Sequence, residues 1–315
     1  MNRHRTAISV LLATGALLAG ALTAASPSAA EQRPAPGSWS AERMRAATPL
    51  DITATPGIAA PGTAARTAPT TAERPTTIAP TPADASPTAF PQPGGAWTSG
   101  GAVVKTSGRV FFTFNGKSAS CSGDSITSAN GSTVITAGHC VKYQGAWHTN
   151  WIFVPGYDNG NAPYGQWTAT KTFATDQWVA SEDMNMDVGL AVVAPLNGRT
   201  LSQAVGAQGI VFNGGYNKKM YAFGFPAAAP YDGSKLVYCS GNSGKDFLLT
   251  KDHSLPCNMT GGSSGGPWFQ DFNEATGLGT QVSVNSFGYT FLPNRMFGPY
   301  FGSEAKAAYD KAQTA

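Results

Sequence analysis

Charged residues are scarce in this 315-residue chain, which has 21 Lys and Arg against 18 Asp and Glu and a formal net charge of +3. The basic residues form no cluster, so the charge pattern lacks the footprint of a nucleic-acid binding surface. Cysteine and histidine number four each, and neither a C-x-x-C nor an H-x-x-x-H spacing occurs. The sequence therefore predicts no nucleic-acid partner, no metal site and no cofactor.

The first 30 residues have the pattern of a secretory signal peptide. A basic start at residues 3–5 precedes an apolar run from 7 to 22, and small residues lead up to Ala30. This arrangement is typical of a signal-peptidase cleavage site. The alternative, a membrane anchor, is disfavoured because the run is interrupted and short for a bilayer span. We expect a secreted, extracellular protein with no membrane association after cleavage.

Residues 31–96 are rich in Pro, Ala and Thr and contain no cysteine. Almost no large apolar residues occur in this segment beyond Trp39, Leu50, Ile52 and Phe90. Such a segment cannot bury enough apolar surface to offset the conformational entropy lost on ordering. We expect it to be extended and mostly disordered, acting as a spacer or as a pro-segment that is removed on maturation.

The remainder, residues 97–315, is glycine-rich sequence with the patterns of β-strands. Residues 110–114 alternate as in a half-buried strand, and residues 190–193 and 281–287 are further strand candidates. Asn130-Gly131 lies between two strand-like stretches, which predicts a β-hairpin.

Only residues 303–313 have helical spacing in this part of the chain. Four residues lie on one stripe of that helix: Ala305, Ala308, Tyr309 and Ala312. We expect this helix to dock on the domain rather than to act in function.

Three motifs carry the chemistry: TAGHC around His139, DVGLAVV from Asp187 and TGGSSGGP around Ser264. They supply a base, a carboxylate that orients it and a nucleophile, which are the parts a serine hydroxyl needs to react at neutral pH. Asp187 directly precedes an apolar run that would hold its carboxylate partly buried. Asp176 and Asp183 are alternatives for this role, but both lie in a polar stretch typical of a solvated loop.

The order His, Asp, Ser along the chain separates this arrangement from other serine hydrolases. GGSSG also fits the G-x-S-x-G pattern of α/β-hydrolase esterases, whose histidine follows the serine. No histidine follows Ser264 here, since the last one is His253. The alternation of strand and helix expected of that fold is also missing, so the esterase interpretation is disfavoured.

The three motifs are similar to the signature segments of chymotrypsin-like serine endopeptidases. The stretches FVPGY, APYG and AFGFP are similar to those of the bacterial glutamyl-endopeptidase branch, and the resemblance extends from about residue 100 to the end. It implies an all-β fold of two packed six-stranded antiparallel β-barrels with a short C-terminal helix. The first barrel would span about 97–195 and the second about 196–300, with the three catalytic residues at their seam.

An even number of cysteines behind a signal peptide implies disulfides, and four cysteines allow three pairings. The order of the cysteines and the family resemblance both favour Cys121 with Cys140 and Cys239 with Cys257.

The glycines of the last motif suit an oxyanion hole, because the backbone N–H groups of Gly262 and Ser264 can point together at a substrate carbonyl. Many trypsin-fold zymogens carry an aspartate just before the nucleophile, and this chain has Ser263 there. The glutamyl-endopeptidase branch also lacks that aspartate, so the departure agrees with the closer resemblance.

In the family, a Ser-aromatic-Gly segment lines the primary specificity pocket, and Ser286, Phe287 and Gly288 match it. Glutamate cleavers of this branch usually carry a histidine just before that serine, where this chain has Asn285. No aspartate occurs near Asn258, where a trypsin carries the counter-charge for Lys or Arg. We therefore expect a pocket for uncharged side chains and no strict preference for Glu, Lys or Arg on the acyl side of the cut (P1).

Together these observations predict a secreted, monomeric serine endopeptidase that cleaves protein or peptide substrates through an acyl-enzyme intermediate. The alternative is a trypsin-fold binding protein that has lost catalysis. Such a protein would lack a member of the triad, and all three residue types are present here.

Overall fold

A computed structural model describes residues 39–54, 75–78 and 90–315. The predicted signal peptide lies outside the described residues. Strands dominate, and the helices are short: α1 (Ala41–Arg45), α2 (Val103–Thr106), α3 (Asp176–Ser181), α4 (Leu201–Val205) and α5 (Ser303–Gln313), with 3₁₀ turns at Gly138–Cys140 and Met184–Met186. Within the described ranges, no helix has both the length and the apolar character needed to cross a membrane.

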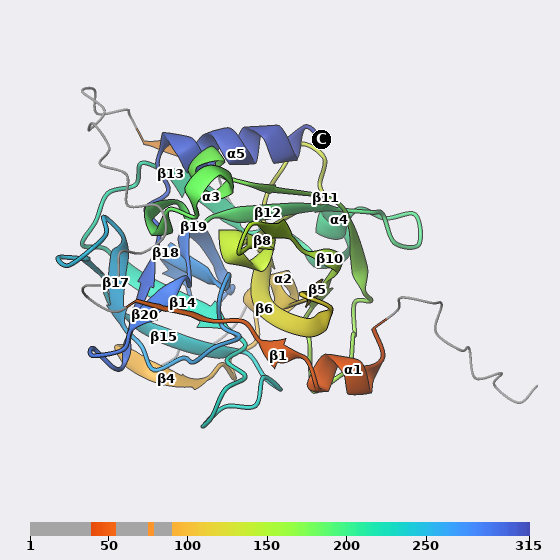
Figure 1. Cartoon of the computed structure of the whole chain (residues 1–315), viewed down its shortest axis with the longest axis horizontal. Coiled ribbons are helices and arrows are strands. Elements are labelled where there is room, and N and C mark those ends of the chain that lie inside the picture. Colours follow the sequence, from red (N-terminus) through yellow and green to blue (C-terminus); the bar gives the residue numbers. More distant parts are fainter. Residues whose placement is uncertain (1–38, 55–74, 79–89) are drawn as a thin grey trace, which may run out of the picture. The chain divides into compact units, whose positions relative to one another are not determined.

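The first half of the β-rich part forms a closed antiparallel barrel (Figure 1). Its strands follow the order β6 (Lys117–Ser125), β5 (Ser107–Phe114), β10 (Thr149–Pro155), β11 (Trp167–Ala174), β12 (Gly189–Val193) and β7 (Thr133–Thr136), and β7 pairs again with β6. The predicted hairpin is present between β6 and β7, where Gly131 has a φ of +62°. A short hairpin of β8 (Lys142–Tyr143) and β9 (Ala146–Trp147) follows the 3₁₀ turn after β7.

The second half distributes its strands over two sheets. One has the order β3 (Thr76–Ile78), β13 (Gly209–Phe212), β19 (Leu278–Val284), β18 (Pro267–Asn273), β14 (Lys219–Gly224), β15 (Val237–Asn242) and β4 (Gln92–Ala96). The other has the order β16 (Gly244–Lys245), β17 (His253–Pro256), β21 (Arg295–Gly298), β20 (Phe287–Tyr289) and β2 (Ile52–Ala54). The predicted all-β, chymotrypsin-like architecture with one C-terminal helix is confirmed.

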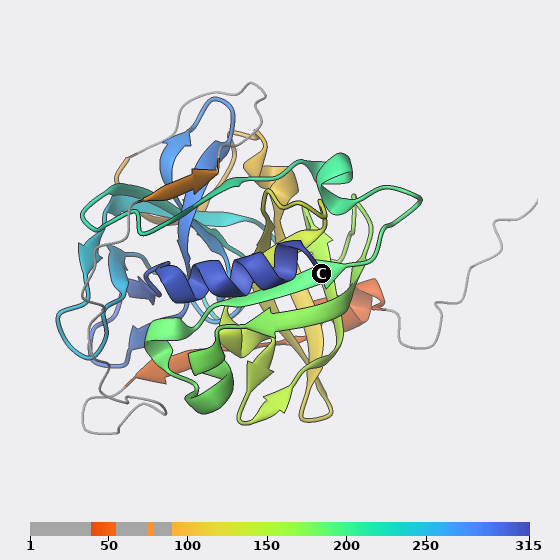
Figure 2. The same cartoon turned by 90° about the horizontal axis from the view of Figure 1, so that it is seen from above.

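Helix α5 begins and ends at the predicted residues and packs on β11 and β12 (Figure 2). The predicted stripe is its buried face, since Ala305, Ala308, Tyr309 and Ala312 are at most 3% exposed. The Tyr309 hydroxyl also donates a hydrogen bond of 2.7 Å to the carbonyl of Thr127. The helix therefore acts as a cover for the first barrel.

Strand β5 differs from the half-buried strand expected at 110–114. Val110, Phe111 and Phe112 are all fully buried. Val110 and Phe112 face the interior of the barrel, whereas Phe111 belongs to a second apolar cluster outside it. The sequence of a strand cannot show that its outer face is also buried when the cover of that face comes from a distant part of the chain.

That covering segment comes from the region expected to be disordered, and the expectation is wrong for the described part of residues 31–96. Trp39 and Met44 are each 1% exposed, and the Trp39 ring lies 5.4 Å from that of Phe111. Figure 1 shows the orange-red segment that holds α1 and β1 (Thr48–Pro49) lying on the barrel beside β6. The segment needs no core of its own, because its few apolar side chains are buried on a surface that the barrel already provides.

Candidate active site

Strand pairing brings the histidine and aspartate motifs together. His139 lies in the 3₁₀ turn that follows β7, and Asp187 lies two residues before the start of β12. The two strands pair with Gly189 opposite Thr136, so the turn and the aspartate meet at the same end of the barrel. Position 138 must be glycine, because a Cβ there would come within 2.7 Å of the Trp178 ring.

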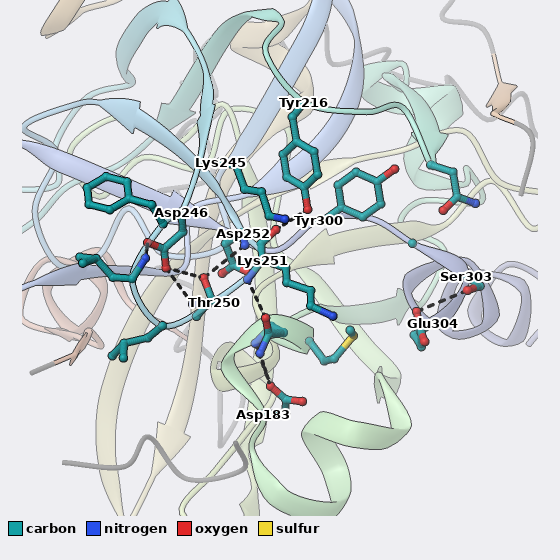
Figure 3. Close-up of a pocket in the computed structure, with 17 residues that line it drawn as sticks. Asp183, Tyr216, Lys245, Asp246, Thr250, Lys251, Asp252, Tyr300, Ser303 and Glu304 are labelled. Atoms are coloured by element: carbon teal, nitrogen blue, oxygen red, sulfur yellow. Dashed lines mark hydrogen bonds between the residues drawn. The ribbon is translucent and has the colours of Figure 1, made fainter. Parts of the chain in front are cut away.

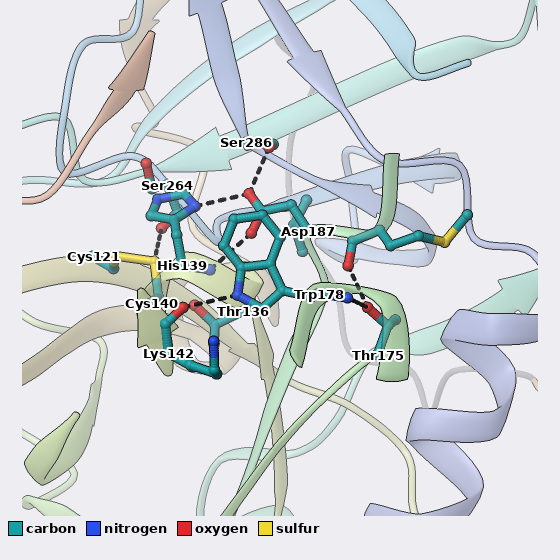
Figure 4. Close-up of polar contacts among 12 residues, drawn as sticks. Cys121, Thr136, His139, Cys140, Lys142, Thr175, Trp178, Asp187, Ser264 and Ser286 are labelled. Atoms are coloured by element: carbon teal, nitrogen blue, oxygen red, sulfur yellow. Dashed lines mark hydrogen bonds and ion pairs between the residues drawn. A yellow bond between two sulfur atoms is a disulfide. The ribbon is translucent and has the colours of Figure 1, made fainter. Parts of the chain in front are cut away.

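The carboxylate of Asp187 is fixed by three hydrogen bonds (Figure 4). One oxygen lies 2.8 Å from Nδ1 of His139 and accepts a bond of 2.6 Å from the Ser286 hydroxyl. The other accepts a bond of 2.8 Å from the backbone N–H of His139. A carboxylate can only accept, so Nδ1 of a neutral imidazole carries the proton and Nε2 is the basic nitrogen.

The alternative aspartates do not reach the imidazole. Asp176 is paired with Lys311 at the surface, at 2.9 Å. Asp183 accepts hydrogen bonds from Asn185 and lines a separate cavity of about 550 Å³ (Figure 3).

Ser264 is held close to the histidine turn through its backbone. Its carbonyl accepts a bond of 2.7 Å from the N–H of Ser122 on β6, and it lies 3.7 Å from Sγ of Cys140. His139 Nε2 is buried without a hydrogen-bond partner among the described residues, so the expected bond to the Ser264 hydroxyl is not formed here. Such contacts are often long without substrate and shorten in the reactive complex.

The two positions after Ser264 must be glycine, because the backbone there lies too close to neighbouring residues for a side chain. Gly265 has a φ of +82°, and a Cβ there would lie 2.0 Å from the Thr136 hydroxyl. A Cβ at Gly266 would lie 2.1 Å from the carbonyl of Phe223. The motif therefore specifies a tight turn that no other residue type would fit.

Two backbone N–H groups at this turn, those of Gly262 and Ser264, are available for a ligand. Gly262 has a φ of +94°, and its carbonyl accepts a bond of 2.9 Å from the Ser122 hydroxyl. Within the part of the chain that the structure describes, the N–H groups of Gly262 and Ser264 donate no hydrogen bond. The hydroxyl of Ser263 instead donates to the carbonyl of Thr260 at 2.8 Å and is buried.

Both predicted disulfides are present and brace this region. Cys121 on β6 is joined to Cys140 beside the histidine, and Cys239 on β15 is joined to Cys257.

The predicted specificity residues separate into two groups. Asn258 and Gly288 line a pocket of about 210 Å³ together with Met259, Thr260 and Met296. In contrast, Asn285, Ser286 and Phe287 are not among its lining residues. Ser286 turns to Asp187, and Phe287 stacks on Phe297 in the core at a ring distance of 5.2 Å.

Asn285 is the clearest correction, because its side chain is fully buried and bonded internally. Its amide donates to the carbonyls of Phe223 at 2.8 Å and Ser263 at 3.0 Å, and its oxygen accepts from Trp268 at 2.6 Å. Asn285 therefore positions the loop that holds Ser264. Its sequence position next to Ser286 could not reveal this, since all three partners come from other strands or loops.

His148 was not singled out by the sequence analysis, although it supports the turn that holds His139. Its Nε2 lies 2.8 Å from the carbonyl of His139, and its ring stacks on Phe112 at 4.3 Å. Burial lowers the pKa of His148 to about 4, so the ring is neutral at physiological pH and its Nε2 donates to that carbonyl.

Comparison with known proteins places this geometry in a family. No protein-family model matches the chain. A stretch of 61 residues is 38% identical to an extracellular metalloprotease of Bacillus subtilis strain 168, and this match spans 19% of the chain and only 20% of that protein. Among solved structures, Glu endopeptidase is 16% identical with a TM-score of 0.56 over 70% of this chain and 97% of that one, which shows a shared fold alone.

Two solved structures are much more similar. Protease Anisep from Arthrobacter nicotinovorans is 44% identical with a TM-score of 0.64, over 68% of this chain and 98% of that one. Thermostable serine protease AL20 from an extremophilic microorganism is 43% identical with the same TM-score, over 68% of this chain and 99% of that one. The chain therefore belongs to the chymotrypsin-like serine proteases and is a serine-type endopeptidase.

Proposed function

We propose that this endopeptidase works through a triad of Ser264, His139 and Asp187, with the N–H groups of Gly262 and Ser264 as its oxyanion hole. The observation that carries the proposal is the buried Asp187 carboxylate, which accepts bonds from both Nδ1 and the backbone N–H of His139. Those contacts orient the imidazole with Nε2 as the base.

In the proposed reaction, His139 Nε2 removes the hydroxyl proton of Ser264 as its oxygen attacks the scissile carbonyl. The carbonyl oxygen becomes negatively charged and is met by the two N–H groups. The imidazolium then gives its proton to the leaving amine, the C–N bond breaks, and an acyl-enzyme remains on Ser264. Water, deprotonated by the same nitrogen, hydrolyses this ester and restores the serine.

A fluorophosphonate probe tests the nucleophile directly. We expect the protein that accumulates in the medium to be labelled stoichiometrically at Ser264, as located by peptide mass spectrometry. Ser264→Ala should take up no label, whereas Ser263→Ala should keep it, because the Ser263 hydroxyl is already bonded to the carbonyl of Thr260. Absence of label on the folded wild-type protein would favour the non-catalytic binding protein instead.

We further propose that the primary pocket takes uncharged side chains. Met259 and Met296 pack together in one apolar cluster beside it. Arg295 is the one cation among the lining residues. Side chains alternate along β21, so that of Arg295 lies on the same strand face as Phe297 and on the opposite face from Met296. The carbonyl of Arg295, rather than its side chain, lies near Gly288. An acidic side chain in the pocket would therefore lack a counter-charge.

A peptide-library cleavage profile checks this preference. We expect cuts after uncharged residues to exceed cuts after Glu by at least about tenfold in kcat/KM. Arg295→Gln should leave the profile unchanged. A preference for Glu that disappears in Arg295→Gln would contradict the proposal and assign the guanidinium to the pocket.

Secretion belongs to the same proposal. The signal-peptide pattern of residues 1–30 and two disulfides in the folded part both fit an oxidising compartment outside the cell. We propose that the protein acts there as a monomer on protein or peptide substrates.

A further inference from the structure

A segment of residues 31–96, which we call the leader, lies against the proposed active site. We call residues 48–54, which contain β1 and β2, the strap. Strand β2 pairs with β20 in parallel, with Ile52 opposite Phe287 and Thr53 opposite Gly288. Since β21 occupies the other edge of β20, the strap fills the edge that is left. A peptide that binds by adding a strand to this sheet would need the same edge.

The strap is also next to the catalytic groups. A Cβ at Gly261, beside the proposed oxyanion hole, would lie 3.0 Å from Cβ of Asp51. Asp51 and Thr53 line the primary pocket together with Asn258 and Gly288. Desolvation raises the pKa of the Asp51 carboxyl and the His139 imidazole lowers it, which agrees with this closeness.

The catalytic groups are covered in this arrangement. Ser264 is 3% exposed, and Nε2 of His139 is buried without a partner among the described residues. A substrate carbonyl must reach both atoms before any bond can form. With the strap in place, these groups are therefore inaccessible to a substrate.

Contacts with the first barrel and with the second half of the β-rich part hold the strap. On the first barrel, β1 pairs with β6, and the N–H of Leu50 donates to the carbonyl of Ser120 at 2.9 Å. In the second half, the N–H of Thr290 donates to the carbonyl of Ala54 at 3.2 Å. Ile52 and Ala54 are 7% and 6% exposed, whereas Thr53 between them is exposed.

The residues before the strap add a second attachment outside the cleft. Trp39 and Met44 are buried in the apolar cluster that contains Phe111. Nε of Arg43 donates to the Ser118 hydroxyl at 3.0 Å. Because this attachment is covalently continuous with the strap, it keeps the strap at a high effective concentration at the cleft.

We propose that the strap is an intramolecular inhibitor: it holds the full chain latent by occupying the edge of β20 and the mouth of the primary pocket, and activity requires its release. This inference rests on the proposed triad, because it assigns the strap to the same site. The buried side chains of Ile52 and Ala54 and the bonds of its backbone hold it there, so a charge at either position should release it.

The test compares full-length variants whose leader is verified by intact mass. Ile52→Asp should raise kcat/KM for an extended peptide substrate by at least about tenfold over the full-length wild type, since a carboxylate cannot remain buried against Phe287. Thr48→Asp is the matched control: it adds the same charge to the strap at an exposed position outside the cleft and should stay within about twofold.

Ala54→Asp is the second releasing variant, and thermal unfolding establishes that each variant is folded. A folded Ile52→Asp or Ala54→Asp protein that is no faster than the wild type would overturn the strap proposal. Ile52→Asp combined with Ser264→Ala separates the two proposals. If Ile52→Asp is activated but activity survives the loss of Ser264, the strap stands and the triad fails. If all full-length variants are equally active and all depend on Ser264, the triad stands and the strap fails.

Discussion

Ser264→Ala is expected to lower kcat of the secreted, active protein on a peptide substrate by about 10⁵ to 10⁶. The hydroxyl oxygen of Ser264 is the atom that would form the acyl bond. The hydroxyl of the adjacent residue, Ser263, is buried and donates to the carbonyl of Thr260 at 2.8 Å, so it is not placed to replace it. Some rate above the uncatalysed reaction should remain, because the oxyanion hole and substrate binding are untouched.

The matched control for this variant is Ser263→Ala, which removes a hydroxyl from the adjacent position. Loss of the Ser263 hydroxyl should lower kcat by no more than about tenfold, since it removes one internal hydrogen bond of the loop that holds Ser264. Both rates are measured on a peptide substrate, after active-site titration of the wild type. A Ser264→Ala protein that keeps more than a hundredth of the wild-type kcat would exclude Ser264 as the nucleophile.

Asp187→Asn is expected to lower kcat by about 10⁴ while leaving the fold intact. An amide has nearly the same shape as a carboxylate but can donate hydrogen bonds. Its NH₂ group would face Nδ1 of His139 and favour the tautomer that carries the proton on Nε2. The nitrogen that must accept the proton of Ser264 would then be blocked.

The control for Asp187→Asn is the same change at Asp176, one of the alternatives that the sequence left open. Asp176 is 79% exposed in its pair with Lys311, so Asp176→Asn should change kcat by less than about threefold. Steady-state kinetics on one peptide substrate and thermal unfolding compare the two variants. Equal kcat values for the two would show that Asp187 does not orient the base.

Local sequence predicted the parts of this molecule whose geometry depends on neighbours along the chain. The Asn130-Gly131 hairpin and helix α5 form where the turn residues and the apolar stripe place them. The glycines around Ser264 likewise mark a turn that closes within a few residues. In each case the constraint is a backbone conformation or a side-chain period, and both are readable from residue types alone.

The expectation of disorder for residues 31–96 is wrong for their described part, and the reason is physical. The composition of this segment correctly indicates that it cannot form a core of its own. It does not indicate that Trp39 and Ile52 pack into two apolar clusters of the folded domain. A segment poor in apolar residues can still pack when a few of them meet a surface that is already formed.

The sequence by itself indicated the family and the proposed chemistry of this protein: a histidine, an aspartate and a serine in an order that is typical of one family of proteases, with glycines that fix the serine in a tight turn. The tertiary structure decided which groups meet. The pairing of β7 with β12 selected Asp187 as the partner of His139, and bonds from other loops turned Asn285 inward. The pairing of β2 with β20 placed the strap beside the proposed active site. These contacts join residues far apart in the chain, so no local pattern of residue types encodes them.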